Sequence, residues 1–362
     1  MELGLVLNTH GVGSRDDADW WHQPMDPDEM KPVEAAQLAE RLGFHSVWVG
    51  DHVALKETSP ESTSPVHVEG RSNPEVRQRG TGDADVGGSK RHYPARPNIL
   101  DGVACFGAIA VSTSRIKFGP GVLIAPYRHP LSDARQYATL DYLSGGRVFL
   151  GVGPGWMKEE FDAVNQPHEH RLAMTEECLQ IYKKAWTEPL VTYHGKFYDF
   201  ENMGMDPKPI SRPHPPIAYG AVTPAGTRLC AREADAFYPI LVRPHDDPHM
   251  HDHLVEILKR ELDRIGRPES EMGMMGLISA RISKADDAEA RRNPRRNCGG
   301  TAEQIVSDMQ RFAEAGYSLL VVAPDVPSHT YAEYEEQVEW LGKEVLPEVK
   351  QIKAAGNWRT EF

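Results

Sequence analysis

Short runs of apolar and β-branched residues alternate along the whole chain with longer stretches of amphipathic, helix-like spacing. The runs that predict strands are, in order, 3–7, 46–50, 116–124, 147–153, 216–221, 236–242, 272–282 and 318–324. A segment that predicts a helix follows each of them, at 31–43, 98–112, 130–143, 156–186, 223–234, 247–266, 301–316 and 331–352. Strands that alternate with helices in this way are typical of a parallel α/β protein.

The strand–helix pairs follow one another without a change of composition that would divide the chain into halves. Eight pairs in a row favour a closed (β/α)8 barrel, a TIM barrel, over an open doubly wound sheet. We therefore expect residues 1–362 to form a single α/β barrel domain with insertions in its βα loops.

Two segments fall outside this alternation. Residues 54–97 are polar and rich in Gly, Ser and Pro, which predicts a long loop insertion after the second strand. This loop is either a mobile surface segment or a lid, because βα loops lie on the active-site face of a barrel. The second segment, 187–215, contains the run VTYHGKFYDF, which predicts a hairpin that turns at His194 and Gly195.

The charge balance argues against a nucleic-acid partner. The chain has 53 acidic and 40 basic residues, so its overall field repels phosphate backbones and anionic membrane surfaces. No apolar run reaches the length of about eighteen residues that a membrane span needs, and the first residues do not follow a signal-peptide pattern. We therefore expect a cytoplasmic protein that binds neither nucleic acid nor membranes.

Cysteine and histidine patterns do not predict a metal site. The cysteines lie far apart without a C-x-x-C pair, which predicts reduced core residues: Cys105, Cys178, Cys230 and Cys298. In the histidine-rich run 243–254, His249, His251 and His253 alternate just before a helix, which is more typical of a solvated cap than of metal ligands on one face. The basic run 290–298 predicts a solvated loop.

The run RVFLGVGPGWMKEEF, residues 147–161, passes from an apolar strand through alternating glycines into an acidic helix start. A dinucleotide fingerprint needs G-x-G-x-x-G early in a βαβ unit, and neither this spacing nor this position in the chain agrees with it. The run instead predicts a strand-to-helix turn whose backbone approaches a flat or anionic ligand. We expect Glu159 and Glu160, in the first helical turn, to face solvent, where the helix dipole favours them.

The same run is part of a wider resemblance. ATLDYLSGGRVFLGVGPGWMKEEF (138–161), preceded by FGPGVLIAPYRHPLSDARQ (118–136), resembles the bacterial-luciferase-like superfamily of flavin- and deazaflavin (F420)-dependent oxidoreductases. ERLGFHSVWVGDH (40–52) and the later runs HGKFYDF, RPHPPIAYGA and AEAGYSLLVVAP extend the resemblance over nearly the whole chain. It implies a TIM barrel with the ring of reduced FMN or coenzyme F420 over the C-terminal ends of the strands.

The resemblance also implies roles for residues at the ends of the strands. It puts Asp51 and His52 beside the flavin as catalytic residues, with His52 as proton donor or hydrogen-bond partner. From the residues alone, Asp51 also fits a turn cap and His52 a polar residue of the rim. Trp156 is either a wall of the substrate or flavin pocket or an anchor of the fourth helix.

The residues that the resemblance implies for cofactor binding are Gly121, Val122, Gly153, Gly155, Gly220, Ala221 and Thr223. Related barrels carry a bulge with a non-proline cis peptide in the third strand, and the matching bond here is Gly121–Val122. The alternative is that Gly119, Pro120 and Gly121 end this strand early. Thr223 also predicts the N-cap of the following helix.

The function that follows from the resemblance is an oxidoreductase. It would use reduced F420 or FMN for hydride transfer to, or monooxygenation of, a small organic substrate. The alternative is a noncatalytic flavin- or ligand-binding barrel subunit. We expect a homo-oligomer, a dimer or a tetramer, and a separate flavin reductase if the cofactor is FMN. The sequence leaves the substrate open, and also the choice between F420 and FMN.

Overall fold

The computed structural model describes residues 1–9, 26–54, 98–240, 248–283, 298–324 and 330–361. Its main sheet is parallel and consists of β1 (Glu2–Val6), β2 (Ser46–Val49), β3 (Lys117–Pro120), β4 (Leu123–Ile124), β5 (Leu150–Gly153), β8 (Ile217–Tyr219), β9 (Ala236–Phe237), β10 (Gly273–Ile282), β11 (Gly299–Gly300) and β12 (Leu319–Pro324). Neighbouring strands follow the order β3-β2-β1-β12-β10-β9-β8-β5-β4, with β11 paired to β10.

The barrel closes because β3 and β4 are two halves of one predicted strand. β4 pairs with β5, and a parallel bridge between Phe118 and Val148 joins β3 to the residues just before β5. At this closure, a Cβ on Gly119 would lie 1.6 Å from the carbonyl oxygen of Phe149, so only glycine lets the two strands approach so closely. The predicted (β/α)8 TIM barrel is confirmed.

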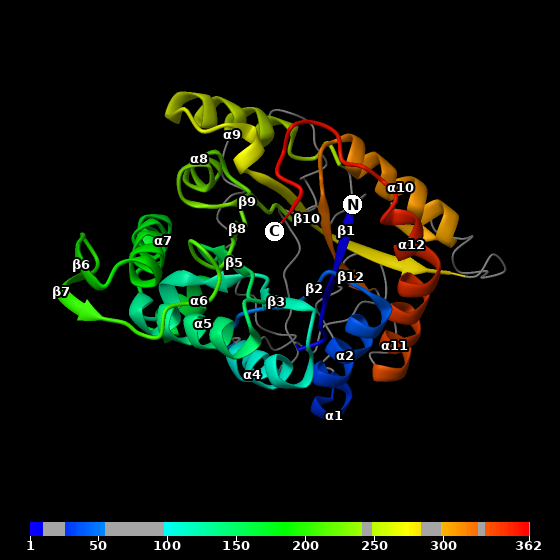
Figure 1. The fold of residues 1–362 in the computed structure, drawn as a ribbon, viewed down its shortest axis with the longest axis horizontal. Coiled ribbons are helices and arrows are strands. Elements are labelled where there is room, and N and C mark those ends of the chain that lie inside the picture. Colours follow the sequence, from blue (N-terminus) through cyan, green and yellow to red (C-terminus); the bar gives the residue numbers. More distant parts are fainter. Residues whose placement is uncertain (10–25, 55–97, 241–247, 284–297, 325–329, 362) are drawn as a thin grey trace, which may run out of the picture.

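Helices surround this barrel (Figure 1). They are α1 (Pro27–Met30), α2 (Pro32–Leu42), α4 (Gly102–Ser112), α5 (Pro130–Ser144), α6 (Lys158–Ala163), α7 (Arg171–Thr187), α8 (Pro224–Glu233), α9 (Asp252–Ile265), α10 (Ala302–Glu314), α11 (Tyr331–Trp340) and α12 (Leu346–Val349). Local sequence explains several boundaries: the Thr223 hydroxyl accepts a hydrogen bond from the Gly226 amide at the start of α8, as predicted for an N-cap.

The single helix predicted over 156–186 is wrong, because the structure divides it into α6 and α7. Asn165 adopts the left-handed conformation, with φ 56°, and Pro167 follows it. A left-handed residue ends a helix, and proline lacks the amide hydrogen that would continue it. A 3-10 turn at His168–His170 then leads into α7.

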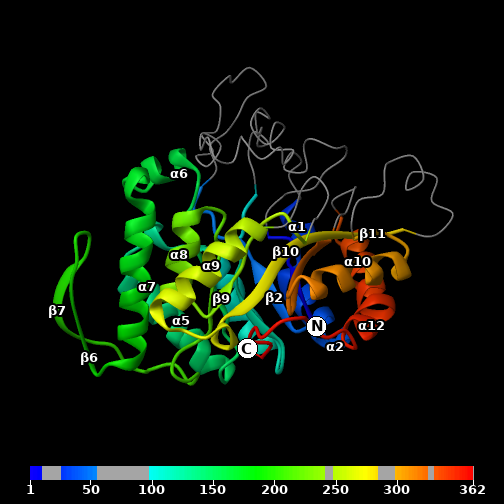
Figure 2. The same ribbon diagram turned by 90° about the horizontal axis from the view of Figure 1, so that it is seen from above.

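An antiparallel hairpin of β6 (Leu190–His194) and β7 (Asp199–Gly204) lies beside α7 at the edge of the molecule (Figure 2). The carboxylate of Glu177, on α7, accepts hydrogen bonds from the backbone amides of Lys196, Phe197 and Tyr198 in the hairpin turn. This contact ties the tip of the hairpin to the helix.

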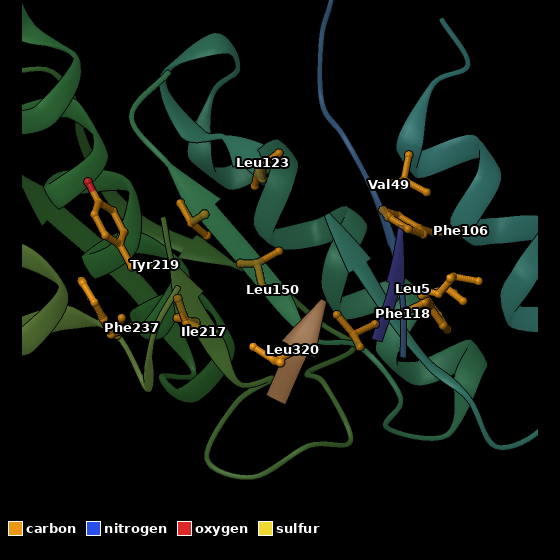
Figure 3. Close-up of a cluster of buried hydrophobic side chains, with 14 of the residues drawn as sticks. Leu5, Val49, Phe106, Phe118, Leu123, Leu150, Ile217, Tyr219, Phe237 and Leu320 are labelled. Carbon is orange, nitrogen blue, oxygen red and sulfur yellow. The ribbon is translucent and has the colours of Figure 1, made fainter. Parts of the chain in front are cut away.

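Buried side chains form two layers. Because strand residues alternate between faces, one set fills the space between strands and helices, and Figure 3 labels several of its members, among them Leu150 and Tyr219. The other set fills the barrel interior: Trp48, Phe149, Ala218, Ala236, Tyr238, Met275, Leu319 and Val321. All four cysteines are free and buried, as predicted.

Candidate active site

A histidine and a glutamate that follow β2 and β5, the strands on either side of the β3–β4 break, form the centre of the site. His52 follows β2, and its Nδ1 lies 2.7 Å from Oε2 of Glu160, in the first turn of α6 after β5. The His52 side chain is 13% exposed and that of Glu160 only 1%. His52 is therefore the member of the pair that a ligand at the C-terminal ends of the strands can reach.

Glu160 accepts further hydrogen bonds from around it. The Tyr127 hydroxyl donates to Oε2 at 2.9 Å, and the amides of Val53 and Ala54 donate to Oε1 at 2.9 and 3.3 Å. An ionised carboxylate only accepts hydrogen bonds, so Nδ1 of His52 is the donor in this contact, and Nε2 is the other ring nitrogen.

The prediction that Glu160 faces solvent is wrong. The first turn of α6 lies against the end of β2, so the side chain of Glu160 points into the site. There its carboxylate is hydrogen-bonded to His52 and Tyr127 instead of to water. The adjacent Glu159 is half-buried. Acidic residues are favourable at a helix start because the free backbone amides there attract negative charge. The contact with β2 decides that Glu160, and not Glu159, is buried.

Asp51 is held by an arginine. Its carboxylate makes a bidentate pair with Arg128, with N–O distances of 2.6 and 2.8 Å, and also accepts from the amide of Ile124 at 2.9 Å. The hydrogen bonds that Arg128 donates to the Asp51 carboxylate raise the pKa of the Arg128 guanidinium above its ordinary value. These contacts tie the end of β2 to β4 and orient the backbone that carries His52.

A third carboxyl lies behind this ion pair. Asp133, on α5, is 1% exposed and accepts a hydrogen bond from the Tyr182 hydroxyl at 2.9 Å. Burial raises the pKa of Asp133 to about 7, although Arg128 and the Tyr182 hydrogen bond act in the opposite direction. Asp133 therefore titrates in the neutral pH range, close to the residues that position the site.

The strand break between β3 and β4 lies next to the His52 site. The peptide bond Gly121–Val122 is cis, which confirms the prediction for this bond, and the Gly121 amide donates to the carbonyl of Val49 on β2 at 2.8 Å. Val122 lies between two glycines, since a Cβ on Gly153 would be 2.7 Å, and one on Gly220 3.3 Å, from its methyl groups. The structure thus brings these four predicted residues together.

The glycine turn after β5 also packs against the strand break. Gly155 has φ 77°, and a Cβ there would lie 2.6 Å from Cγ2 of Ile124 and 2.9 Å from the ring of Phe161. The half-buried Trp156 follows, with its ring edge-on to that of His52 and the centroids 6.5 Å apart. Close packing of the turn therefore needs a residue without a side chain at Gly155. This packing places Trp156 beside His52.

The remaining predicted residues lie at the end of β8. Ala221 is buried and its amide donates to the carbonyl of Tyr219, while Thr223 caps α8. Sequence reasoning missed Glu160, Tyr127 and Arg128 as site residues. Only the YRH motif in 118–136 was a signal for Tyr127 and Arg128, because that run formed part of the resemblance.

Other features noted in the sequence lie on other elements or outside the described residues. His249 pairs with Asp252 at the surface, and His251 contacts the carbonyl of Ile240. The described part of the chain contains no group of three side chains suited to hold a metal ion, and none of its helices is long and apolar enough to cross a membrane. Residues 55–97, most of the loop insertion, lie outside the described ranges, as do 243–247 and 290–297.

A closed (β/α)8 barrel that carries a partly buried His–Glu pair at the C-terminal ends of its strands belongs to the TIM-barrel class, in which this face holds the active site. Residues 84–360 match the family model described as luciferase-like monooxygenase. The chain is therefore a member of the luciferase-like family of flavin- and F420-dependent oxidoreductases.

Individual relatives agree with this assignment. An uncharacterized protein of Mycobacterium tuberculosis is 32% identical over 66% of this chain and 71% of its own length. The FMNH2-dependent dimethylsulfone monooxygenase of Pseudomonas putida is 24% identical over 71% of this chain and 80% of its own length. Among solved structures, an F420-dependent secondary alcohol dehydrogenase in complex with an F420-acetone adduct has a TM-score of 0.67 at 17% identity, over 96% of this chain and 98% of its own.

Proposed function

We propose that this protein is an oxidoreductase that binds reduced FMN or reduced F420 at the barrel mouth and acts on a small organic substrate. The observation that carries the proposal is the His52–Glu160 pair, next to the strand break at Gly121–Val122. Both cofactor types occur among the relatives: one uses FMNH2 and a structural neighbour uses F420.

The residues at the strand ends fit a flat, largely apolar ring. Val122 is held between glycines on two strands, and the buried hydroxyl of Tyr238 has no hydrogen-bond partner among the described residues. We propose that the ring is held by Gly121, Val122, Gly153, Gly155 and Gly220, and that Ala221 and Thr223, at the start of α8, are near its phosphate-bearing chain. When bound, the cofactor supplies the hydride, or the electrons that activate oxygen for monooxygenation.

The protein residues orient groups and move a proton. We propose that His52 donates or accepts a proton at Nε2, with Glu160 as the acceptor that orients its ring. Asp51, fully engaged by Arg128 and the Ile124 amide, is assigned a positioning role, narrower than the catalytic one expected from the sequence. Trp156 forms a pocket wall beside His52 that excludes water.

Several broader expectations belong to the same proposal. The 362 residues form one barrel domain, with the insertion 54–97 and the excursion 187–215 as additions to it. The protein works in the cytoplasm as a homo-oligomer, without nucleic-acid or membrane partners. If FMN is its cofactor, a separate reductase supplies the reduced form.

A binding experiment tests the proposal and identifies the cofactor. Purified protein is titrated anaerobically with FMN and with F420, each oxidised and then reduced, while the visible spectrum and fluorescence are recorded. We expect saturable binding of one reduced cofactor, followed by its reoxidation with oxygen or an organic acceptor. Binding without any reoxidation beyond that of the free cofactor would favour a noncatalytic barrel subunit, and no binding of either cofactor would contradict the proposal.

A further inference from the structure

A tyrosine connects the strand break to the His52–Glu160 pair. Tyr127 is the last residue of a 3-10 turn that follows β4 directly, and it is 6% exposed. Its hydroxyl donates a hydrogen bond at 2.9 Å to Oε2 of Glu160, the oxygen that also lies 2.7 Å from Nδ1 of His52. One carboxylate oxygen is therefore shared between the His52 ring and a residue that follows the strand break.

The donors to the Glu160 carboxylate come from two different segments. His52 and the amides of Val53 and Ala54 belong to the segment that follows β2. Among the described donors, Tyr127 is the one that comes from the segment after β4. The contacts of residues 52–54 hold His52 to the carboxylate, but they do not join it to β4. The Tyr127 hydrogen bond makes that connection.

The next residue along the chain makes a second connection between the same two segments. Arg128 holds the carboxylate of Asp51 in a bidentate pair, and Asp51 directly precedes His52. Arg128 thus acts on the backbone before His52, whereas Tyr127 acts on the carboxylate behind the His52 ring. Because a fixed backbone still allows the ring to adopt other rotamers, the orientation of the ring depends on the carboxylate.

Packing holds the Tyr127 side chain in one place. Its ring lies edge-on to that of Phe161, with the centroids 5.0 Å apart and an interplanar angle of 72°. Ile124 belongs to the same buried cluster, and Phe161 directly follows Glu160 in α6. Because the tyrosine ring is already ordered by this packing, its hydrogen bond costs little additional conformational entropy and has a fixed direction.

We propose that Tyr127 is a positioning residue, which acts through Glu160 to fix the orientation of the His52 ring relative to the Gly121–Val122 segment. This inference rests on the proposed function, which puts the cofactor ring at that segment. A misplacement of about 1 Å between reacting groups can lower a rate by about 100-fold, and proton transfer needs hydrogen-bond geometry. Loss of the Tyr127 hydroxyl should therefore slow proton transfer at His52 and leave the affinity for the cofactor unchanged.

The experiment compares Tyr127→Phe with Tyr193→Phe, and repeats the first change in a Glu160→Ala background. Tyr193, in the β6–β7 hairpin at the edge of the molecule (Figure 2), donates a hydrogen bond from its hydroxyl to Oε1 of Gln180 at 2.7 Å. It therefore matches Tyr127 as a hydroxyl bound to a side-chain oxygen of another element, but it belongs to the hairpin and not to the site.

Four quantities are measured for each variant. Nitrogen NMR spectra of histidine-labelled protein without cofactor report the state of the His52 ring, whose signals are assigned by their absence in His52→Ala. The dissociation constant of the reduced cofactor is measured next, and then the rate constant for its reoxidation, with oxygen as the acceptor for FMN and menadione for F420. The midpoint of thermal unfolding reports the stability.

We expect Tyr127→Phe to shift the His52 ring signals and to lower the reoxidation rate constant by about tenfold, while the dissociation constant of the cofactor stays at the wild-type value. Tyr193→Phe should change only the midpoint of thermal unfolding. In the Glu160→Ala background, Tyr127→Phe should have no further effect on the His52 signals or on the rate, because the acceptor of its hydrogen bond is gone.

Wild-type His52 signals in Tyr127→Phe would overturn the inference, since the hydrogen bond would then be purely structural. Equal losses of rate from Tyr127→Phe with and without Glu160 would overturn it as well, because the tyrosine would not act through the carboxylate. Failure of the wild type to bind either cofactor would overturn the proposed function. The His52 spectra, recorded without cofactor, would still show whether Tyr127 orients the histidine.

Discussion

Nδ1 of His52 is hydrogen-bonded to Oε2 of Glu160, a residue 108 positions further along the chain, at 2.7 Å. The glutamate is almost fully buried and the histidine is the more exposed partner. This geometry suits the roles proposed above, in which the His52 ring transfers a proton and the Glu160 carboxylate orients the ring. Its contribution can be measured by changing each partner separately.

Glu160→Gln keeps the size of the side chain but removes its charge. We expect kcat/KM to fall by about 10- to 100-fold, because an amide orients the His52 ring less well and no longer stabilises its protonated form. The pH profile of kcat/KM should also change, because the charge beside the proposed proton-exchanging ring is gone. Glu159→Gln, one residue away, is the control and should leave the profile unchanged. A uniform loss of rate at every pH would instead indicate a purely structural role.

His52→Ala removes the group proposed to exchange the proton. We expect turnover to fall by about 100-fold or more, while the dissociation constant of the cofactor changes little. Stopped-flow measurement of cofactor oxidation separates the two effects. His249→Ala, at a surface ion pair with Asp252, is the control. A turnover number equal to that of the wild type would exclude His52 from the mechanism.

Gly153→Ala tests the packing between β5 and the strand break. The new Cβ would lie 2.7 Å from Cγ2 of Val122, so we expect a loss of about 1 to 3 kcal/mol in the free energy of unfolding. Removing the obstructing methyl groups in Val122→Ala should recover part of this loss in the double variant. Denaturant titration of the two single variants and the double variant measures the coupling. Additive losses would show that the two positions do not contact each other.

The Asp133 carboxyl makes the free energy of unfolding depend on pH. The folded protein keeps the proton on this carboxyl up to about pH 7, whereas the ordinary pKa is 3.8. Between these values the folded state binds a proton that the unfolded state lacks, so this group makes stability fall as pH rises, by up to about 1.4 kcal/mol per pH unit.

Asp133→Asn removes this titration. We therefore expect the variant to gain more stability over the wild type at pH 8 than at pH 5, measured as the midpoint of thermal unfolding. Asp162→Asn, whose side chain is 59% exposed, is the control and should show no such difference. Equal gains for Asp133→Asn at both pH values would show that Asp133 is already ionised, or already neutral, across this range.

Much of the fold followed from the spacing of apolar residues. A strand that is buried on both faces has a short, continuous apolar run in the sequence. When such runs alternate with amphipathic helices, a closed parallel barrel buries all of the strands. The cap at Thr223 is local chemistry, and the cis bond at Gly121–Val122 followed from a family resemblance. The break at Asn165 was missed because the helical pattern continues on both sides of it.

The sequence by itself determined that His52 lies at the C-terminal end of a barrel strand, because the order of strands and helices brings all such ends to one face. Only the tertiary structure decided that Glu160, and not solvent, is its partner, and that Tyr238 points into the barrel with an unpaired hydroxyl. The physical reason is that periodicity specifies which elements meet. Periodicity does not specify which side chain fills the space between two elements. That depends on how each element is rotated and how closely it packs, and both are set by contacts between residues far apart in the chain.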